Sequence, residues 1–266
     1  MLEALSYSFI QNALIAGIIV SFVSGIIGSL VVANRMVFLA GGIAHASYGG
    51  IGIAIFSGIP IFWGTSVFAV IAALFMALVT INQREKIDTF IGLIWAVGMA
   101  IGIIFVDLTP GYNVDLMSYL FGSILAVNHD DLYFMGSLFI LIIFSVTFWY
   151  RDILAVSYDS EYAALRGTNV KFFYTLILVL SALTVVIAIK VVGLILVIAL
   201  LTIPIYIAQT LSSSLYSMMI ISGFIASIFT VVGLWISYSY DLTSGACIIL
   251  VSAISLMIFM IGTKLK

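Results

Sequence analysis

One histidine inside an apolar run is the residue in this sequence best suited to bind a ligand. His45 lies in the glycine-rich run from Phe38 to Gly50. If this run is helical, residues three, four and seven apart share a face, and His45 then lies on one stripe with Gly41, Gly42, Gly49 and Gly52. Small residues on a stripe let a second helix approach closely. We therefore expect the imidazole to face protein or a water-filled path, and not lipid.

Two interpretations of His45 are open. In the first, its ring nitrogens bond to neighbouring backbone or hydroxyl groups and fix the packing of the helix, and the spacing alone favours this. In the second, it is a transient ligand for a transition metal, because neutral imidazole binds zinc, manganese and iron to differing degrees. Ionisable residues inside a membrane are functional candidates. A structural zinc site needs about four ligands, whereas a conducted ion must bind weakly enough to leave.

A short polar segment from Asp159 to Lys171 carries a second candidate pattern. Asp159 or Ser160 can cap a brief helix, an acid in the first turn suits the helix dipole, and a glycine can supply the left-handed residue that ends it. The segment therefore predicts a short helix parallel to the membrane. Its pattern is an acid, a small residue two positions on and a glycine six positions on: Glu161, Ala163 and Gly167.

Several acids outside the apolar runs and one proline within them are further candidates. The acids fall at loop ends, where their field could draw cations toward an entrance, although solvated loop ends normally carry such residues: Asp107, Asp115, Asp130, Asp131 and Asp241. We retain Asp115 and Asp241 as possible entrance residues. Pro204 falls inside a predicted helix, where it removes one backbone hydrogen bond and so predicts a kink or a pivot for gating.

The composition requires a membrane to hold these residues. Of 266 residues, 64% are hydrophobic and 8% are charged, which is too little polar surface for a water-soluble fold. We predict an all-α, polytopic transmembrane bundle that forms one permease domain over residues 1–266. Its apolar segments, each near the ~20 residues that span a bilayer, are 8–33, 38–57, 61–81, 89–106, 132–150, 172–189, 191–209, 215–238 and 243–262.

The distribution of basic residues predicts the orientation. Nine crossings place the two ends of the chain on opposite sides. Eight of the nine Lys and Arg residues then fall on one side, and only Lys190 falls on the other. The positive-inside rule makes the side with eight cytoplasmic, so we expect the N-terminus outside and the C-terminus in the cytoplasm.

The apolar stretch 116–127 is too short to span the bilayer, and acids flank it on both sides. It predicts a re-entrant or interfacial helix whose backbone ends must be covered by protein.

Other features exclude several function classes. A net charge of -2 without a basic tract argues against nucleic acid as a partner. The lone Cys247 cannot form an internal disulfide. No phosphate-binding loop is present, so any ATP-driven function needs a second subunit. No hydrolase motif is present either, so we expect a transport subunit and no enzyme.

A secondary transporter driven by a gradient, with His45 as the titrating group, is the alternative, although we find no internal repeat.

Several stretches together resemble the membrane-permease subunits of ABC importers for zinc, manganese or related divalent metals. The matching stretches follow one another in family order over nearly the whole chain: Arg35 to Gly50, Pro110 to Leu125, Glu161 to Gly167, Val192 to Pro204 and Asp241 to Gly245.

The resemblance implies a homodimer in a prokaryotic inner or plasma membrane. A cytoplasmic ATPase would bind beneath it through the helix from Glu161 to Gly167, and an extracytoplasmic metal-binding protein would deliver the ion above. The chain itself would hold no cofactor, and the divalent metal would be the transported substrate. The same pattern from Glu161 to Gly167 would, however, also fit an ordinary capped linker helix that binds no ATPase.

The chain departs from the family pattern at two positions. The family has an aspartate and a histidine in the second helix; the histidine aligns with His45, but the aspartate position is Gly41. A second position that is often acidic is Ser123. Loss of a carboxylate removes a hard oxygen ligand and a negative charge, which favours zinc over manganese, while iron remains an alternative.

Overall fold

The computed structural model describes residues 7–81, 87–110, 120–195 and 197–264, and every regular element in this part is a helix. Eight helices are long and apolar enough to cross a bilayer. They are α1 (Ser8–Ala33), α2 (Val37–Ser57), α3 (Ile61–Thr80), α4 (Ile87–Asp107), α6 (His129–Phe148), α9 (Val170–Val192), α12 (Leu215–Tyr240) and α13 (Ser244–Lys264). The predicted helical bundle is confirmed.

The predicted helix over 191–209 is wrong as a single element. Helix α9 continues to Val192 and ends at Gly193, whose φ of 84° is left-handed. The chain then forms two short helices, α10 (Val197–Leu200) and α11 (Ile203–Leu211). Thr202 lies between them with φ -126° and ψ -49°, outside helical geometry, and its hydroxyl donates to the carbonyl of Ile198 at 2.8 Å. The run is as apolar as one spanning helix, but its helical structure is interrupted at Thr202.

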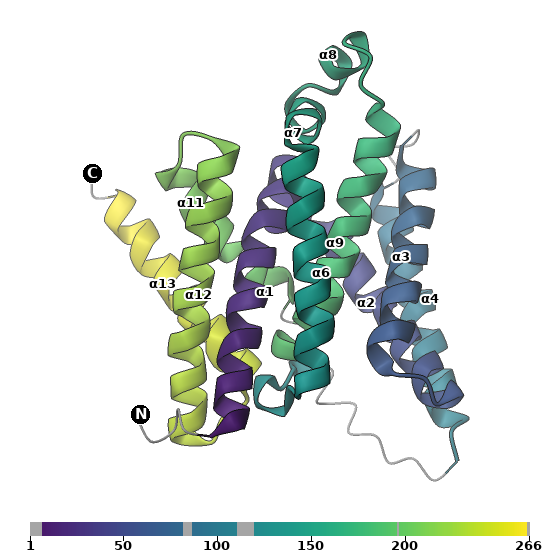
Figure 1. Ribbon diagram of the computed structural model, residues 1–266, viewed down its shortest axis with the longest axis vertical. Coiled ribbons are helices and arrows are strands. Elements are labelled where there is room, and N and C mark those ends of the chain that lie inside the picture. The colour runs from purple at the N-terminus through teal and green to yellow at the C-terminus, as the bar shows by residue number, and fades with distance from the viewer. Residues whose placement is uncertain (1–6, 82–86, 111–119, 196, 265–266) are drawn as a thin grey trace.

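The helices run up and down along the long axis of the molecule (Figure 1). Helix α1 begins at the lower end of the view, and α13 ends toward the upper end. Two short helices, α7 (Tyr150–Tyr158) and α8 (Ser160–Leu165), lie at the upper end between α6 and α9. The interrupted segment α10–α11 carries the chain back up before α12 descends and α13 rises, so α1 and α13 run in the same direction.

Helix α2 is held in the bundle by close contacts between glycines. A Cβ atom on Gly49 would meet the Phe68 ring of α3 at 2.7 Å and the Gly98 carbonyl of α4 at 2.9 Å. One on Gly98 would meet the backbone of Ala46 at 2.5 Å, and the backbones of Gly52 and Gly102 also touch. The predicted small-residue stripe is therefore a helix interface.

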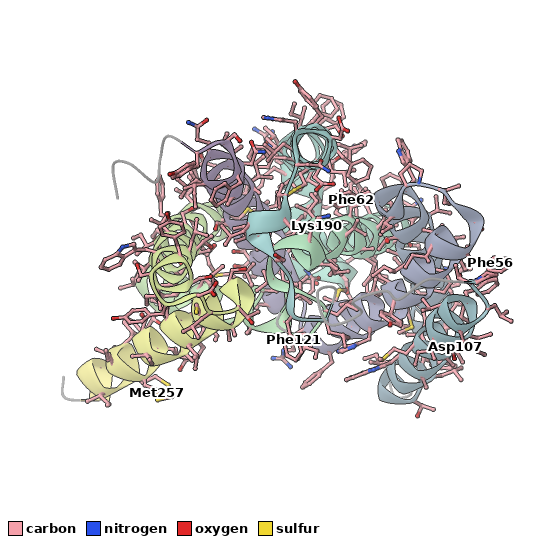
Figure 2. All side chains as sticks on the ribbon, turned by 90° about the horizontal axis from the view of Figure 1, so that it is seen from below. Phe56, Phe62, Asp107, Phe121, Lys190 and Met257 are labelled. Carbon is pink, nitrogen blue, oxygen red and sulfur yellow. The ribbon has the colours of Figure 1, made fainter. Side chains whose placement is uncertain are left out.

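Apolar side chains cover the outside of the bundle, as a lipid environment requires. Helix α13 is an example, because five of its large residues are more than half exposed: Leu250, Ile254, Met257, Ile258 and Ile261. Figure 2 shows Met257 at the outer edge of this helix, while Lys190 and Phe62 lie near the centre of the lower end.

Candidate functional site

His45 lies near the middle of α2 and is buried, with 7% of its surface exposed. The indole of Trp95, from α4, stacks flat on the imidazole, with ring centroids 3.9 Å apart and 6° between the planes. Its buried Nδ1 has no hydrogen-bond partner among the described residues. Buried polar atoms are almost always paired, and Nδ1 is one of three exceptions among the described residues, with the hydroxyls of Ser24 and Ser66.

The Ile198 side chain fills the space beside Gly41, the position that aligns with the family's aspartate. Gly41 faces α10, and a Cβ atom there would meet the Cδ1 atom of Ile198 at 2.6 Å and its Cγ1 atom at 3.0 Å. A carboxylate at position 41 would therefore need Ile198 to move. Within the ranges that the structure describes, no three His, Cys, Asp or Glu side chains gather in a way that could hold a metal ion. Position 41, one turn before His45, thus supplies no carboxylate to it.

The short helix expected between Asp159 and Lys171 is present as α8. The Asp159 carboxylate caps it by accepting from the Tyr162 amide at 2.9 Å. Gly167 ends it with φ 83°, while its amide donates to the Ala164 carbonyl and the Thr168 amide donates to the Ala163 carbonyl, each at 3.0 Å. This pair of bonds is a Schellman motif. The cap and the glycine therefore have the local structural roles that the sequence predicted.

The side chains of α8 divide into an inner and an outer set. Ala163 is fully buried against this chain, so its small size lets α8 lie close to its own bundle. Leu165 is 87% exposed, and Glu161 is exposed as well. The exposed surface of α8 is therefore made of Tyr162, Ala164, Leu165 and the charged residues at its ends, with Ala163 behind it.

A cavity of about 560 Å³ lies beside the start of α8. Its lining comes from the α1–α2 turn, from the ends of α2, α7, α8 and α9 and from α4, and includes Asn34, Arg35, Tyr158 and Ser160. The Asn34 side chain donates to the Ser157 hydroxyl at 2.9 Å and so ties the α1–α2 turn to α7. The turn that leads into the His45 helix is in this way connected to the short helices.

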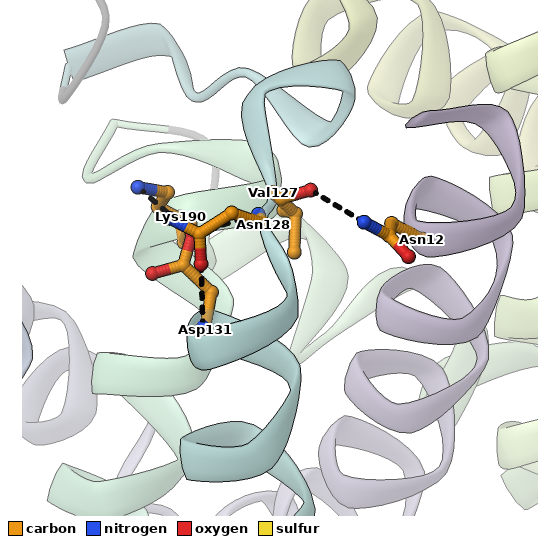
Figure 3. Close-up of polar contacts among 5 residues, drawn as sticks. All are labelled: Asn12, Val127, Asn128, Asp131 and Lys190. Atoms are coloured by element: carbon orange, nitrogen blue, oxygen red, sulfur yellow. Dashed lines mark hydrogen bonds and ion pairs between the residues drawn. The ribbon is translucent and has the colours of Figure 1, made fainter. Parts of the chain in front are cut away.

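At the opposite end, an ion pair that the sequence did not indicate joins α6 to α9 (Figure 3). The Lys190 ammonium lies 3.2 Å from a carboxylate oxygen of Asp131, whose side chain is only 11% exposed. The same ammonium lies 5.9 Å from the centre of the Phe62 ring. Asp131 and Asn128 also form a capping box at the start of α6. An Asn followed three residues later by Asp before an apolar run was the sequence signal for it.

The segment after residue 119 is partly buried, and its short helix packs against α1, α9 and α13. It contains a short 3-10 helix, η3 (Ile124–Ala126), and Asn12 of α1 donates to the Val127 carbonyl at 3.3 Å. The predicted re-entrant helix 116–127 lies partly outside the described residues. Its described end is covered by protein, since Ile124 is fully buried.

Three glycines bring this segment, the end of α9 and the start of α13 into backbone contact. Gly122 and Gly193 both have positive φ, and a Cβ on Gly122 would meet the carbonyl carbon of Val192 at 2.5 Å. A Cβ on Gly245 would meet the Val192 oxygen at 2.7 Å. The amide of Ile124 donates to the Ser244 hydroxyl at 3.2 Å. We call this crossing of residues 120–124, 190–195 and 244–245 the glycine crossing.

The remaining predicted site residues are not brought together. Asp115 lies outside the described residues. Asp241 is the left-handed C-cap of α12, with φ 53°, which gives it a structural position at the end of the helix. Pro204 does not bend a continuous helix, because it lies in the first turn of α11, just after the break, where proline is well tolerated. The amide of Ser123 donates to the Lys190 carbonyl at 3.1 Å within the glycine crossing.

Residues 6–263 match the ABC 3 transport family. The chain is 46% identical to an uncharacterized membrane protein of Synechocystis over 97% of its own length and 92% of the relative's. It is 35% identical to the manganese transport system membrane protein MntC of Listeria monocytogenes, over 94% of this chain and 89% of that protein. Among solved structures, it is similar to PsaBC from Streptococcus pneumoniae in complex with Fab, with a TM-score of 0.86, 32% identity and coverage of 95% and 91% of the two chains.

Proposed function

This chain belongs to the ABC 3 transport family, as a permease of the metal-importer type, and from that premise we propose that it imports a divalent transition metal ion, zinc in the first place. The power for transport comes from separate ATP-binding subunits. In this proposal two copies of the chain enclose the path, His45 of each copy contacts the ion in transit, and an extracytoplasmic metal-binding protein delivers it.

The observation that carries the choice of zinc is the donor set around His45. Position 41 is glycine, and the Ile198 side chain occupies the space that a carboxylate would need. Imidazole is a borderline ligand that suits zinc, whereas manganese prefers carboxylate and water oxygens. A pathway that presents an imidazole without a neighbouring acid therefore supports zinc transport.

Manganese is the second candidate, and the relatives favour it. Similar proteins in Listeria and Streptococcus parasanguinis are named as manganese transport or import components, at 35% and 32% identity. Identity at this level fits a shared fold and transport cycle with a changed ion. The metal preference of this chain must therefore come from its own residues.

In this proposal α8 is the contact with the ATPase. Its exposed Tyr162 and Leu165 would enter a groove on the partner, and Gly167 and Asp159 keep the short helix rigid. Movement of α8 reaches α2 through the hydrogen bond between Asn34 and Ser157. ATP-driven closure would thereby switch access to His45 as a movement between two packed states. The α8 end would be cytoplasmic, and the N-terminus would lie outside.

The test is metal uptake by vesicles that contain this chain with its candidate ATPase and metal-binding partners, supplied with zinc, manganese or ferrous iron. We expect ATP-dependent zinc uptake that a proton or sodium ionophore leaves intact. His45→Ala should abolish uptake while the subunits still co-purify. Uptake driven by an ion gradient without ATP would instead support the secondary transporter, and unchanged uptake by His45→Ala would return the histidine to a packing role.

A further inference from the structure

The contact between His45 and Trp95 has a geometry that separates the face of the imidazole from its edge. The indole covers one face of the ring, since the two planes are 6° from parallel and their centres are 3.9 Å apart. A metal ion binds imidazole through a nitrogen lone pair, which lies in the plane of the ring. Stacking on the face therefore leaves the in-plane lone-pair directions free of the indole, and Nδ1, which is buried inside the protein, has no hydrogen-bond partner in the described structure.

Histidines that bind metals are usually held in place by a hydrogen bond from the second ring nitrogen to a carboxylate or a carbonyl. An unheld imidazole rotates about its side-chain bonds, and each rotation moves both nitrogens. At His45 the flat stack restricts this rotation. Position 41 supplies no carboxylate for such a hydrogen bond, because it is glycine and Ile198 fills the adjacent space.

Trp95 is itself well placed to hold the ring. Its indole N–H donates to the sulfur of Met99 at 3.1 Å, one turn further along α4. The backbone of α4 is fixed against α2 by contacts that admit no side chain, such as that of Gly98 with Ala46. The indole is therefore held by a contact within α4, and the imidazole of α2 stacks on it.

We propose that Trp95 is a positioning residue for the transported ion: it fixes the plane of the His45 imidazole by stacking and keeps the Nδ1 edge presented to a divalent transition metal. The inference rests on the proposed function, because it assigns a role in the binding of the same ion.

The first experiment compares two substitutions in the complete transporter. Trp95→Phe keeps a flat ring on His45, whereas Trp95→Leu keeps an apolar side chain without a stack. We expect Trp95→Leu to raise the apparent KM for zinc uptake about tenfold, the lower range for loss of a group that orients a metal ligand, with the maximal rate and the yield of assembled complex preserved. Trp95→Phe should restore most of the affinity. Trp235→Leu, which removes another half-exposed tryptophan from α12, is the matched control.

The second experiment needs no transport. A variant with Trp63→Phe, Trp149→Phe and Trp235→Phe retains Trp95 as its single tryptophan. Zinc should change the fluorescence of Trp95 in a saturable way, magnesium at the same concentration should not, and adding His45→Gln should remove the response to zinc. If Trp95→Leu does not assemble, this titration and the Trp95→Phe uptake assay decide the proposal.

The outcomes separate this inference from the proposed function. An unchanged KM in Trp95→Leu, or Trp95 fluorescence that ignores zinc in a transporter that still imports it, would overturn the positioning role and leave the import function intact. A zinc response that depends on His45 in a complex without ATP-driven uptake would support the positioning role while the proposed transport function fails.

Discussion

At the scale of single residues, the proposed preference for zinc rests on Gly41 and Ile198. An aspartate at position 41 would add a hard oxygen and a negative charge beside His45, provided that Ile198 is shortened to make room. We predict that the double variant Gly41→Asp with Ile198→Ala gains manganese uptake relative to zinc by about tenfold or more, because carboxylate oxygens suit manganese better than imidazole alone. Competition between the two ions in the vesicle assay measures the ratio.

The matched control for this variant is Gly41→Asn with Ile198→Ala, which has nearly the same shape without the charge. It should leave the manganese-to-zinc ratio near that of the unmodified chain. Gly41→Asp alone should assemble poorly, since its side chain collides with Ile198. Equal ratios in the Asp and Asn variants would show that position 41 does not set the metal preference.

The ion pair between Lys190 and Asp131 makes a second residue-scale prediction. Lys190→Met leaves the poorly exposed Asp131 carboxylate without its cation and should lower stability by about 1–3 kcal/mol. Asp131→Asn keeps an oxygen for the capping box with Asn128 but removes the charge. The double variant should lose less than the sum of the two single losses, because an unpaired charge then no longer remains.

Thermal unfolding of the detergent-solubilised chain measures this cycle. Replacement of Lys171, a basic residue at the other end of the bundle, by Met is the control and should change little. Additive losses for Lys190 and Asp131 would mean that the contact contributes no coupling energy.

At the scale of helices, the end of α8 depends on one backbone conformation. Gly167 has φ 83° with no atom near its missing Cβ, so a side chain there fits the space but strains the backbone. Gly167→Ala should therefore cost about 1 kcal/mol or more, loosen α8 and reduce ATPase stimulation more than overall stability. Gly136→Ala on α6 has equal space and no left-handed angle, so it serves as the control. Equal ATPase stimulation in both variants would show that the shape of α8 does not matter for coupling.

The sequence was sufficient to predict the long helices and α8, because each depends on local signals. Twenty apolar residues in a row, the Asp159 cap and a glycine at position 167 act within one or two turns. The break in 191–209 was not predicted, because that run is as apolar as a spanning helix and the glycine before it contacts a segment some seventy residues earlier. Long-range backbone contact of this kind leaves no periodic pattern in the sequence.

At the scale of the whole molecule, the proposed orientation can be measured directly. With the buried Cys247 replaced by Ser, single cysteines at Ala164 on α8 and at Asp130 at the start of α6 lie on exposed surface at opposite ends of the bundle. A membrane-impermeant thiol reagent added to intact cells should label Asp130→Cys and spare Ala164→Cys, because eight of the nine basic residues lie on the α8 side of the proposed topology. Lysed cells, in which both should react, provide the control. The reverse pattern would separate α8 from any cytoplasmic ATPase.

The candidate site was only partly predictable for the same reason. His45 and its glycine stripe stand out within one helix, so their neighbourhood follows from the helical period. The stacking of Trp95 and the filling of the space at Gly41 by Ile198 join α2 to α4 and α10, and each depends on how three separate segments pack. In the sequence, Asp131 resembles a solvated loop acid, and only the fold shows that Lys190 lies beside it.

The glycine crossing also constrains the order in which the protein can be made. Its first segment, residues 120–124, leaves the ribosome more than a hundred residues before Ser244, to which it is hydrogen-bonded. The contacts of residues 120–124 with Ser244 therefore cannot form until the last helix has entered the bilayer. In a chain truncated after Tyr240, residues 120–124 should therefore be exposed to membrane proteases, even though all the earlier helices have been synthesised.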